Sequence, residues 1–140
     1  MKISARNVFE GSVANIQRGL ISAQVTLTLQ AGETIVAVIT NTSVDLLELR
    51  EGKPAYAIVK SSEVMLGRDI AKGTLSARNI LAGEVKDLHA GAVNSEVEIA
   101  LHGGTAMIAT ITNQSIETLG LKRGDRVSAI VKASNVLIGV

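Results

Sequence analysis

The sequence predicts an all-β protein made of two tandem five-stranded barrels, each with one short helix. The 140 residues contain a long internal repeat, and each copy alternates apolar and polar residues in short runs separated by glycine. The apolar residues are mostly Val, Ile, Leu and Ala, with only one Phe and one Tyr in the chain. This composition is typical of thin, closely packed β layers.

The repeat is a constant alignment of residues 3–68 with residues 75–140, at an offset of 72. No gap is needed, and 25 of the 66 pairs are identical, which establishes a tandem duplication. We expect a first domain at residues 1–68, a linker at residues 69–74 and a second domain at residues 75–140. Units this small bury little apolar surface alone. Because the chain has no cysteine, oligomerisation is the expected source of further stability.

The first half of each copy predicts a strand and a hairpin. In copy one, a long strand is expected from Ile3 to Ile16, with Gly11 bending or bulging it. The alternation from Val25 to Leu29 predicts the next strand, which repeats in copy two from Val97 to Leu101. Hairpin loops are expected at residues 30–33 and 102–105, where glycine interrupts the pattern.

The second half of each copy predicts two more strands around a helix. In copy one, the strands are expected at Ile35 to Thr40 and Ala55 to Lys60. Between them, Thr42 to Leu49 has helical spacing, with Ser43 as the expected N-cap and an end before Gly52. Five strands and one short helix in a unit of this length favour a small barrel of the OB type.

Composition excludes several classes of function. The formal net charge is +1, without the basic excess of a protein that binds nucleic-acid backbone. No apolar run approaches the roughly 18 residues of a membrane span, and residues 1–6 lack the apolar core of a signal peptide. We therefore expect a cytoplasmic protein that binds neither nucleic acid nor membrane.

The duplication also selects candidate site residues, since a site used by both copies should occur twice. His89 and His102 align with Gln17 and Gln30, so no histidine is duplicated. No acid–base pair, Ser–His dyad, phosphate loop or metal-ligand spacing recurs in both copies. We expect no enzymatic activity, no cofactor and no bare metal cation.

Hydrogen-bond donors do recur, and no carboxylate is interleaved with them in either motif. The set comprises Ser4, Arg6, Asn7, Thr40, Asn41, Ser43 and Lys60, with Ser76, Arg78, Asn79, Thr112, Asn113, Ser115 and Lys132. A dianion taken from water requires this kind of set: guanidinium, ammonium, hydroxyl and backbone N–H groups together. The alternative is structural, with the cations at strand ends exposed to solvent and Ser43 serving only as a helix cap.

Three motifs in order resemble the Mop domain. They are Ser4 to Asn7 with Ser76 to Asn79, Gly19 to Ser22 with Gly91 to Asn94, and Ala57 to Ser62 with Ala129 to Ser134. The tandem arrangement over the whole chain resembles the two-Mop molbindins, cytoplasmic proteins that bind molybdate and, similarly, tungstate. The resemblance implies an OB-like barrel per copy and a homotrimer, a ring of six Mop units with oxyanions between them.

By the same resemblance, the molybdate-binding residues fall into matching sets. One face of each site is implied at Ser4, Arg6, Lys60 and Ser61, and at Ser76, Arg78, Lys132 and Ala133, the facing unit contributing Thr40, Ser43, Thr112 and Ser115. An axial site is implied at Gly19, Leu20, Ile21 and Ser22, and at Gly91, Ala92, Val93, Asn94 and Ser95. Because Leu20-Ile21-Ser22 and Ala92-Val93-Asn94 differ, the axial sites of the two copies are expected to differ. Glu63, which aligns with Asn135, is expected to point to solvent.

The leading hypothesis is therefore storage and homeostasis of molybdate or tungstate by a non-catalytic homotrimer. The first alternative is an OB-fold module for single-stranded nucleic acid, which usually stacks bases on aromatics in a basic groove. The scarcity of aromatics and of net charge opposes it. The second alternative is a molybdate-sensing regulatory module that acts through a partner.

Overall fold

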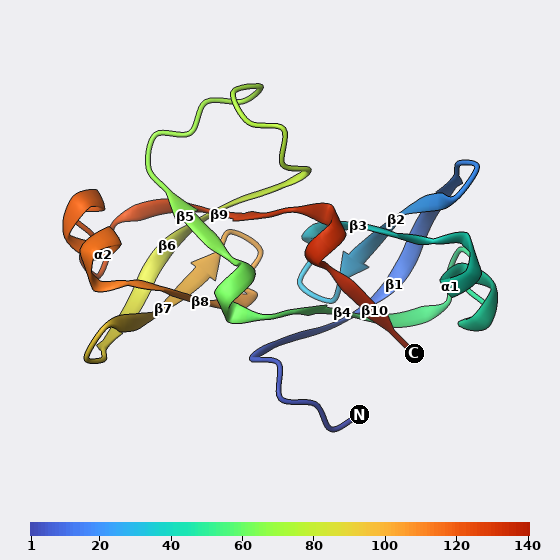
Figure 1. Ribbon diagram of the computed structural model, residues 1–140, viewed down its shortest axis with the longest axis horizontal. Coiled ribbons are helices and arrows are strands. Elements are labelled where there is room, and N and C mark those ends of the chain that lie inside the picture. Colours follow the sequence, from blue (N-terminus) through green and yellow to red (C-terminus); the bar gives the residue numbers. More distant parts are fainter.

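The computed structural model describes all residues from 1 to 140, as two similar halves side by side along the long axis (Figure 1). Alternating burial of Val25, Leu27 and Leu29 confirms the predicted strand, and the loop at residues 30–33 confirms the hairpin. The elements of the first copy are β1 (Asn7–Arg18), β2 (Ser22–Leu29), β3 (Thr34–Thr40), α1 (Asn41–Leu46), β4 (Pro54–Val59), the 3-10 turn η1 (Ser61–Glu63) and β5 (Met65–Gly67).

The second copy repeats this order, as the duplication predicts. Its hairpin loop at residues 102–105 also lies where it is expected. The elements are β6 (Asn79–Ala90), β7 (Asn94–Leu101), β8 (Ala106–Thr112), α2 (Asn113–Leu119), β9 (Arg126–Val131), η2 (Ala133–Asn135) and β10 (Leu137–Gly139). None of the helices is long and apolar enough to cross a lipid bilayer.

The two copies exchange their last strands. The strand orders are β10-β4-β1-β2-β3 in one sheet and β5-β9-β6-β7-β8 in the other. Leu137 of β10 therefore pairs with Ile58 of β4, and Met65 of β5 pairs with Ile130 of β9. The turns η1 and η2 lie near the middle of the molecule and precede β5 and β10, which lie in the halves formed by the other copy (Figure 1). Each sheet thus contains residues of both copies.

The fold class predicted from the sequence is confirmed, with each barrel formed as a curled half-barrel. In the first sheet, the edge strands β3 and β10 are not hydrogen-bonded to each other. Most buried apolar side chains of both copies belong to one cluster of 24 residues, which includes Leu27, Ile35, Ile99 and Met107. The halves therefore share one continuous core, and strand exchange joins them by hydrogen bonds and packing.

Two buried asparagines connect the halves by hydrogen bonds. The Asn7 side chain donates to the Ile108 carbonyl at 2.8 Å and accepts from the Ile108 N–H at 2.8 Å. Asn79 makes the same two bonds to Val36, at 2.8 and 2.7 Å. The amide thus extends the hydrogen bonding of β8 or β3 as a neighbouring strand would. Both side chains are buried in this contact and neither lines the cavity of Arg6 or of Arg78, so neither is presented to an anion there.

The bulge in the long first strand lies beyond the predicted glycine. The register of β1 shifts between Val13 and Asn15, rather than at Gly11. Gly11 serves a different purpose, because a Cβ there would collide with the carbonyl oxygen of Thr28 on β2. The strand also begins at Asn7 rather than Ile3, since residues before Asn7 have no strand partner.

The helix begins earlier than its expected cap. Thr40, not Ser43, is the N-cap of α1, and its hydroxyl accepts from the Ser43 N–H at 3.0 Å. Thr112 caps α2 in the same way, with Ser115 as donor. Thr40 ends strand β3 in extended conformation, so strand end and helix cap are the same residue. The helical spacing of the sequence predicted the cap at Ser43, which lies inside the helix.

Glu33 and Thr105, which align in the repeat, meet each other between the two hairpin loops. The Thr105 hydroxyl and N–H donate to the Glu33 carboxylate at 2.7 and 3.1 Å. Desolvation favours the neutral acid, but the bonds from Thr105 and from backbone N–H groups outweigh it. The pKa of Glu33 therefore lies below its ordinary value of 4.5.

This carboxylate should make part of the stability depend on pH. A group whose pKa is lower in the folded state stabilises fully above its unfolded pKa, and this contribution is lost as pH falls through the folded pKa. We expect the melting temperature of the native protein to fall more steeply than that of Glu33→Gln between about pH 5 and pH 3. Thermal unfolding followed by circular dichroism measures this. The variant Glu51→Gln, at an exposed carboxylate without an ion pair, is the control, and parallel curves for all three proteins would refute the assignment.

The asparagine contacts predict a larger, pH-independent effect. Asn7→Ala leaves the N–H and carbonyl of Ile108 without partners, so the free energy of unfolding should fall by about 2 kcal/mol. Asn79→Ala should behave alike through Val36. Urea denaturation measures both, with Gln17→Ala as the control at an exposed polar residue of β1. A loss equal to that of the control would show that the amides contribute no net stability.

Candidate functional site

Strand pairing brings the two ends of each motif set together. Asn7, the first residue of β1, pairs with Val59, the last residue of β4. The segment before β1 therefore lies beside the segment after β4, and Ser4, Arg6, Lys60 and Ser61 line one cavity of about 290 Å³. The equivalent pairing of Asn79 with Val131 builds a second cavity in the other half.

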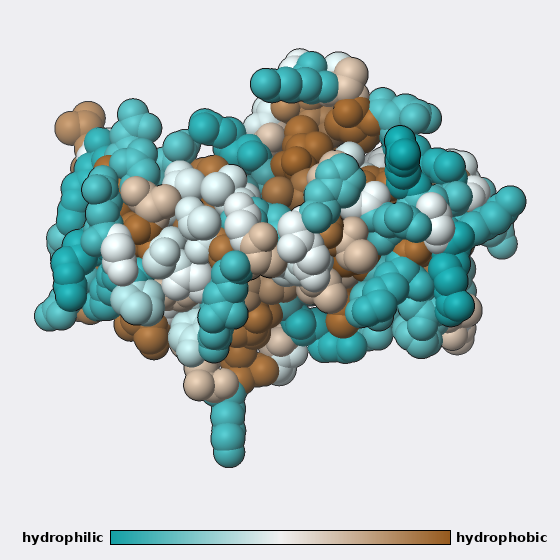
Figure 2. All heavy atoms as spheres, turned by 180° about the vertical axis from the view of Figure 1, so that it is seen from behind, coloured by the Kyte–Doolittle hydropathy of each residue, from teal (hydrophilic) through white to brown (hydrophobic).

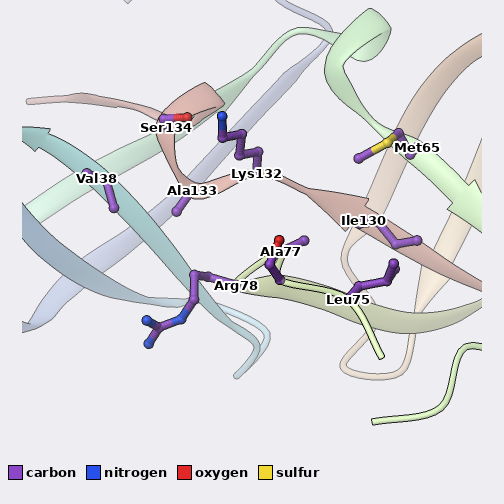
Figure 3. Close-up of a pocket in the computed structure, with 10 residues that line it drawn as sticks. Val38, Met65, Leu75, Ala77, Arg78, Ile130, Lys132, Ala133 and Ser134 are labelled. Atoms are coloured by element: carbon purple, nitrogen blue, oxygen red, sulfur yellow. The ribbon is translucent and has the colours of Figure 1, made fainter. Parts of the chain in front are cut away.

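The second cavity is larger and mainly apolar. It has a volume of about 500 Å³ and includes Ser76, Arg78, Lys132 and Ala133. Leu75, Met65 and Ile130 form an apolar side of this cavity, away from Arg78 (Figure 3). The ammonium of Lys132 and the guanidinium of Arg78 point in different directions, with Ala133 between them (Figure 3). Neither cation forms an ion pair within the chain, so both are available to an incoming anion.

In the first cavity, by contrast, residues of the opposite copy contact the motif. The Arg6 guanidinium forms a hydrogen-bonded ion pair with Glu96 of β7. The Ser61 hydroxyl hydrogen-bonds to the Thr110 hydroxyl of β8 at 2.8 Å. Lys60 has no carboxylate partner. The first site therefore combines one free cation with one that is neutralised.

The threonine–serine pairs predicted for the facing unit lie elsewhere in the chain. The hydroxyls of Thr40 and Ser43 are 2.9 Å apart, and those of Thr112 and Ser115 are 2.8 Å apart. Thr40 and Thr112 are the helix N-caps, Ser43 and Ser115 hydrogen-bond to them, and none of the four lines the cavity of Arg6 or of Arg78. A single chain thus has two separate kinds of polar surface: the cavities with arginine and lysine, and the threonine–serine hydroxyl pairs at the helix starts.

The candidate axial segments form the exposed tips of the β1–β2 and β6–β7 hairpins. Leu20, Ile21 and Val93 are almost entirely exposed at these tips. Asn41 holds the first tip, since its side chain donates to the Gly19 carbonyl at 2.9 Å and its N–H donates to Ile21. Asn113 holds the second in the same way.

The two hairpin tips differ in the buried residue that lies beside the asparagine of each. Ser95 is buried in β7 and donates its hydroxyl proton to the Asn113 side-chain carbonyl. Ala23 occupies the equivalent position in copy one, and the buried Asn41 side-chain oxygen has no partner there. Ser95 thus lies in the strand rather than in the tip, and an axial site at these segments stays a prediction.

Glu63 contacts its own counterpart in the repeat. Its side chain is exposed and accepts a hydrogen bond from Asn135 at 3.0 Å. It does not line the cavity of Arg6, although Lys60 and Ser61 precede it directly. The carboxylate closest in sequence to Lys60 and Ser61 therefore lies outside the first cavity.

Sequence reasoning missed the residues that face the motifs across the two copies. Glu96 and Thr110 are the important ones, and they align with Gln24 and Val38. A search for residues identical in both copies discards such positions. Their signal was a difference between the copies, with Glu96 aligned to the neutral Gln24 and the polar Thr110 aligned to the apolar Val38.

The comparisons with known proteins agree with this architecture. The model of the TOBE domain matches residues 3–66 and again residues 75–138. A solved structure of the cytoplasmic molybdate-binding protein ModG, with molybdate bound, is 47% identical. It superimposes with a TM-score of 0.95 over 100% of this chain and 99% of that one.

Curated relatives are also named for molybdenum. The molybdenum transport protein ModE of Herbaspirillum seropedicae is 43% identical over all 140 residues, and the molybdenum-pterin-binding protein MopA of Rhodobacter capsulatus is 35% identical over the same length. The chain spans about half the length of these curated relatives, 52% and 53% respectively. With two full matches to the family model and a fold shared end to end with ModG, the chain belongs to the TOBE-domain family, of which it carries two tandem copies.

Proposed function

We propose that this protein binds molybdate without transforming it, and so stores and buffers the anion in the cytoplasm. The observation that carries the proposal is the match to ModG over nearly the full length of both chains, because that structure is described as a cytoplasmic protein with molybdate bound. The ModE and MopA relatives are named for molybdenum as well. The match covers 99% of the ModG chain and 52% of ModE, so we propose a function of the ModG type.

The chemistry of the two cavities supports an oxyanion ligand. Each contains an arginine, a lysine and a serine hydroxyl, from segments that the β1–β4 or β6–β9 pairing brings together. Arginine offers a planar set of N–H donors, and lysine a point charge, to the oxygens of a tetrahedral dianion. Tungstate has the same charge and shape, so we propose it as an equivalent ligand. Binding through hydrogen bonds and charge leaves the anion chemically unchanged.

We further propose that the sites are completed by association of three chains. Within one chain the cavities are open, and the pairs Thr40–Ser43 and Thr112–Ser115 do not line them. Apolar atoms gather in areas near the middle of the face in Figure 2, between hydrophilic side chains. Exposed apolar surface of this kind marks an interaction site. A homotrimer would place the hydroxyl pairs of one chain opposite the cations of another.

The arginines give the sharpest test of molybdate binding. A hydrogen bond to a charged group contributes about 1.5–3 kcal/mol, so Arg6→Ala combined with Arg78→Ala should raise the dissociation constant at least about tenfold. Equilibrium dialysis with molybdate measures this. The control is Arg50→Ala combined with Lys72→Ala, which removes the same charge at two exposed residues without ion pairs. Absence of binding by the native protein, or equal binding by both double variants, would refute the proposal.

The assembly has its own test. Sedimentation equilibrium should give three times the 14.6 kDa mass of the chain. Leu20→Lys combined with Ile21→Lys should lower that mass, because two charges at the exposed apolar tip oppose its burial. A native mass of 14.6 kDa at every concentration would contradict the homotrimer.

A further inference from the structure

The two arginine clusters face different residues of the opposite copy. Arg6 is paired with Glu96, whose aligned counterpart is Gln24 on β2. Glu96 pairs in register with Thr110, which bonds to Ser61 of the first cavity. Gln24 pairs in register with Val38, which lines the cavity of Arg78. Val38 thus lines the second cavity, and its register partner on β2 is the neutral Gln24, whereas the register partner of Thr110 is the carboxylate Glu96.

Ion pairing of the arginine and the volume of the cavity also favour anion binding at Arg78 over Arg6. Glu96 and Arg6 are 39% and 49% exposed at their side chains, so the pair is accessible to a competing anion. Arg78 has no carboxylate partner. The cavity of Arg6 is about 290 Å³ and that of Arg78 about 500 Å³. One guanidinium is occupied in a smaller cavity, and the other is free in a larger one.

We propose that the two clusters are unequal anion sites, and that Glu96 sets the difference by acting as an internal competitor for Arg6. The anion occupies the Arg78 site first. At the Arg6 site it must displace the Glu96 carboxylate from the guanidinium, and the displaced carboxylate then repels the bound dianion. This inference rests on the proposed function, since it assumes that the ligand is an oxyanion.

An exposed ion pair alone is weak, so most of the effect comes from repulsion between the carboxylate and the dianion. Two like charges near contact at a protein surface are enough to reduce affinity about tenfold. The chain therefore has a tight class of site for low anion concentration and a weaker class for excess. Such a pair of classes widens the concentration range over which the protein buffers its ligand.

Reciprocal substitutions between the copies test the proposal. Glu96→Gln gives the first site the residue of the second, and Gln24→Glu does the reverse. Equilibrium dialysis with molybdate at low ionic strength should resolve two classes of site in the native protein. Glu96→Gln should tighten the weak class about tenfold, and Gln24→Glu should weaken the tight class by a similar factor. Glu98→Gln is the charge-matched control on the same strand, since Glu98 pairs with Lys86 rather than with Arg6, and it should leave both classes unchanged.

Single arginine variants assign the classes to the two cavities. Arg78→Ala should remove the tight class, and Arg6→Ala should remove the weak one. The inference is overturned if the native protein binds molybdate at one class of site, or if both reciprocal variants bind as the native protein does. It is also overturned if Glu98→Gln changes affinity as much as Glu96→Gln. Absence of any molybdate binding would instead refute the proposed function itself.

Discussion

Exchange of the terminal strands is the constraint on which the other features of this molecule depend. β5 leaves the first copy to pair with β9, and β10 leaves the second to pair with β4. Each unit is too short to bury a large core by itself, and the exchange lets both contribute to one continuous cluster of buried side chains. Because β4 and β9 accept these strands, the lysines that follow them lie where the two copies meet. The candidate motifs are thereby placed at a junction rather than within either copy.

At the junction, the two copies differ at positions where aligned residues contact each other. Two aligned pairs, Glu33 with Thr105 and Glu63 with Asn135, contact each other directly. A glutamate at both members of either pair would place two like charges in contact, and they would repel. Replacement of one member by a hydrogen-bond donor converts a repulsive contact into an attractive one. Duplication within one chain permits this change, whereas two identical chains could not make it.

Divergence at Glu96 has a different consequence, because this residue faces a motif rather than its own counterpart. Its aligned residue is the neutral Gln24, and Ser61 and Thr110 likewise align with Ala133 and Val38. The first junction is consequently polar and internally bonded, and the second is apolar with free cations. The duplicated motifs have been kept while their surroundings have changed, so one sequence pattern is used in two electrostatic environments.

The sequence by itself determined the repeat, the class of fold, the hairpin positions and the motif residues. These follow from local patterns: alternation of apolar residues at Val25 to Leu29, glycine in the loops, and identity at a fixed offset. Only the tertiary structure decided the exchange of β5 and β10, the hydrogen bonds of Asn7 and Asn79 to the opposite copy, and the pairing of Arg6 with Glu96. The physical reason is distance along the chain. Each of these contacts joins residues of different copies, and a local pattern does not encode which distant strand will lie beside it.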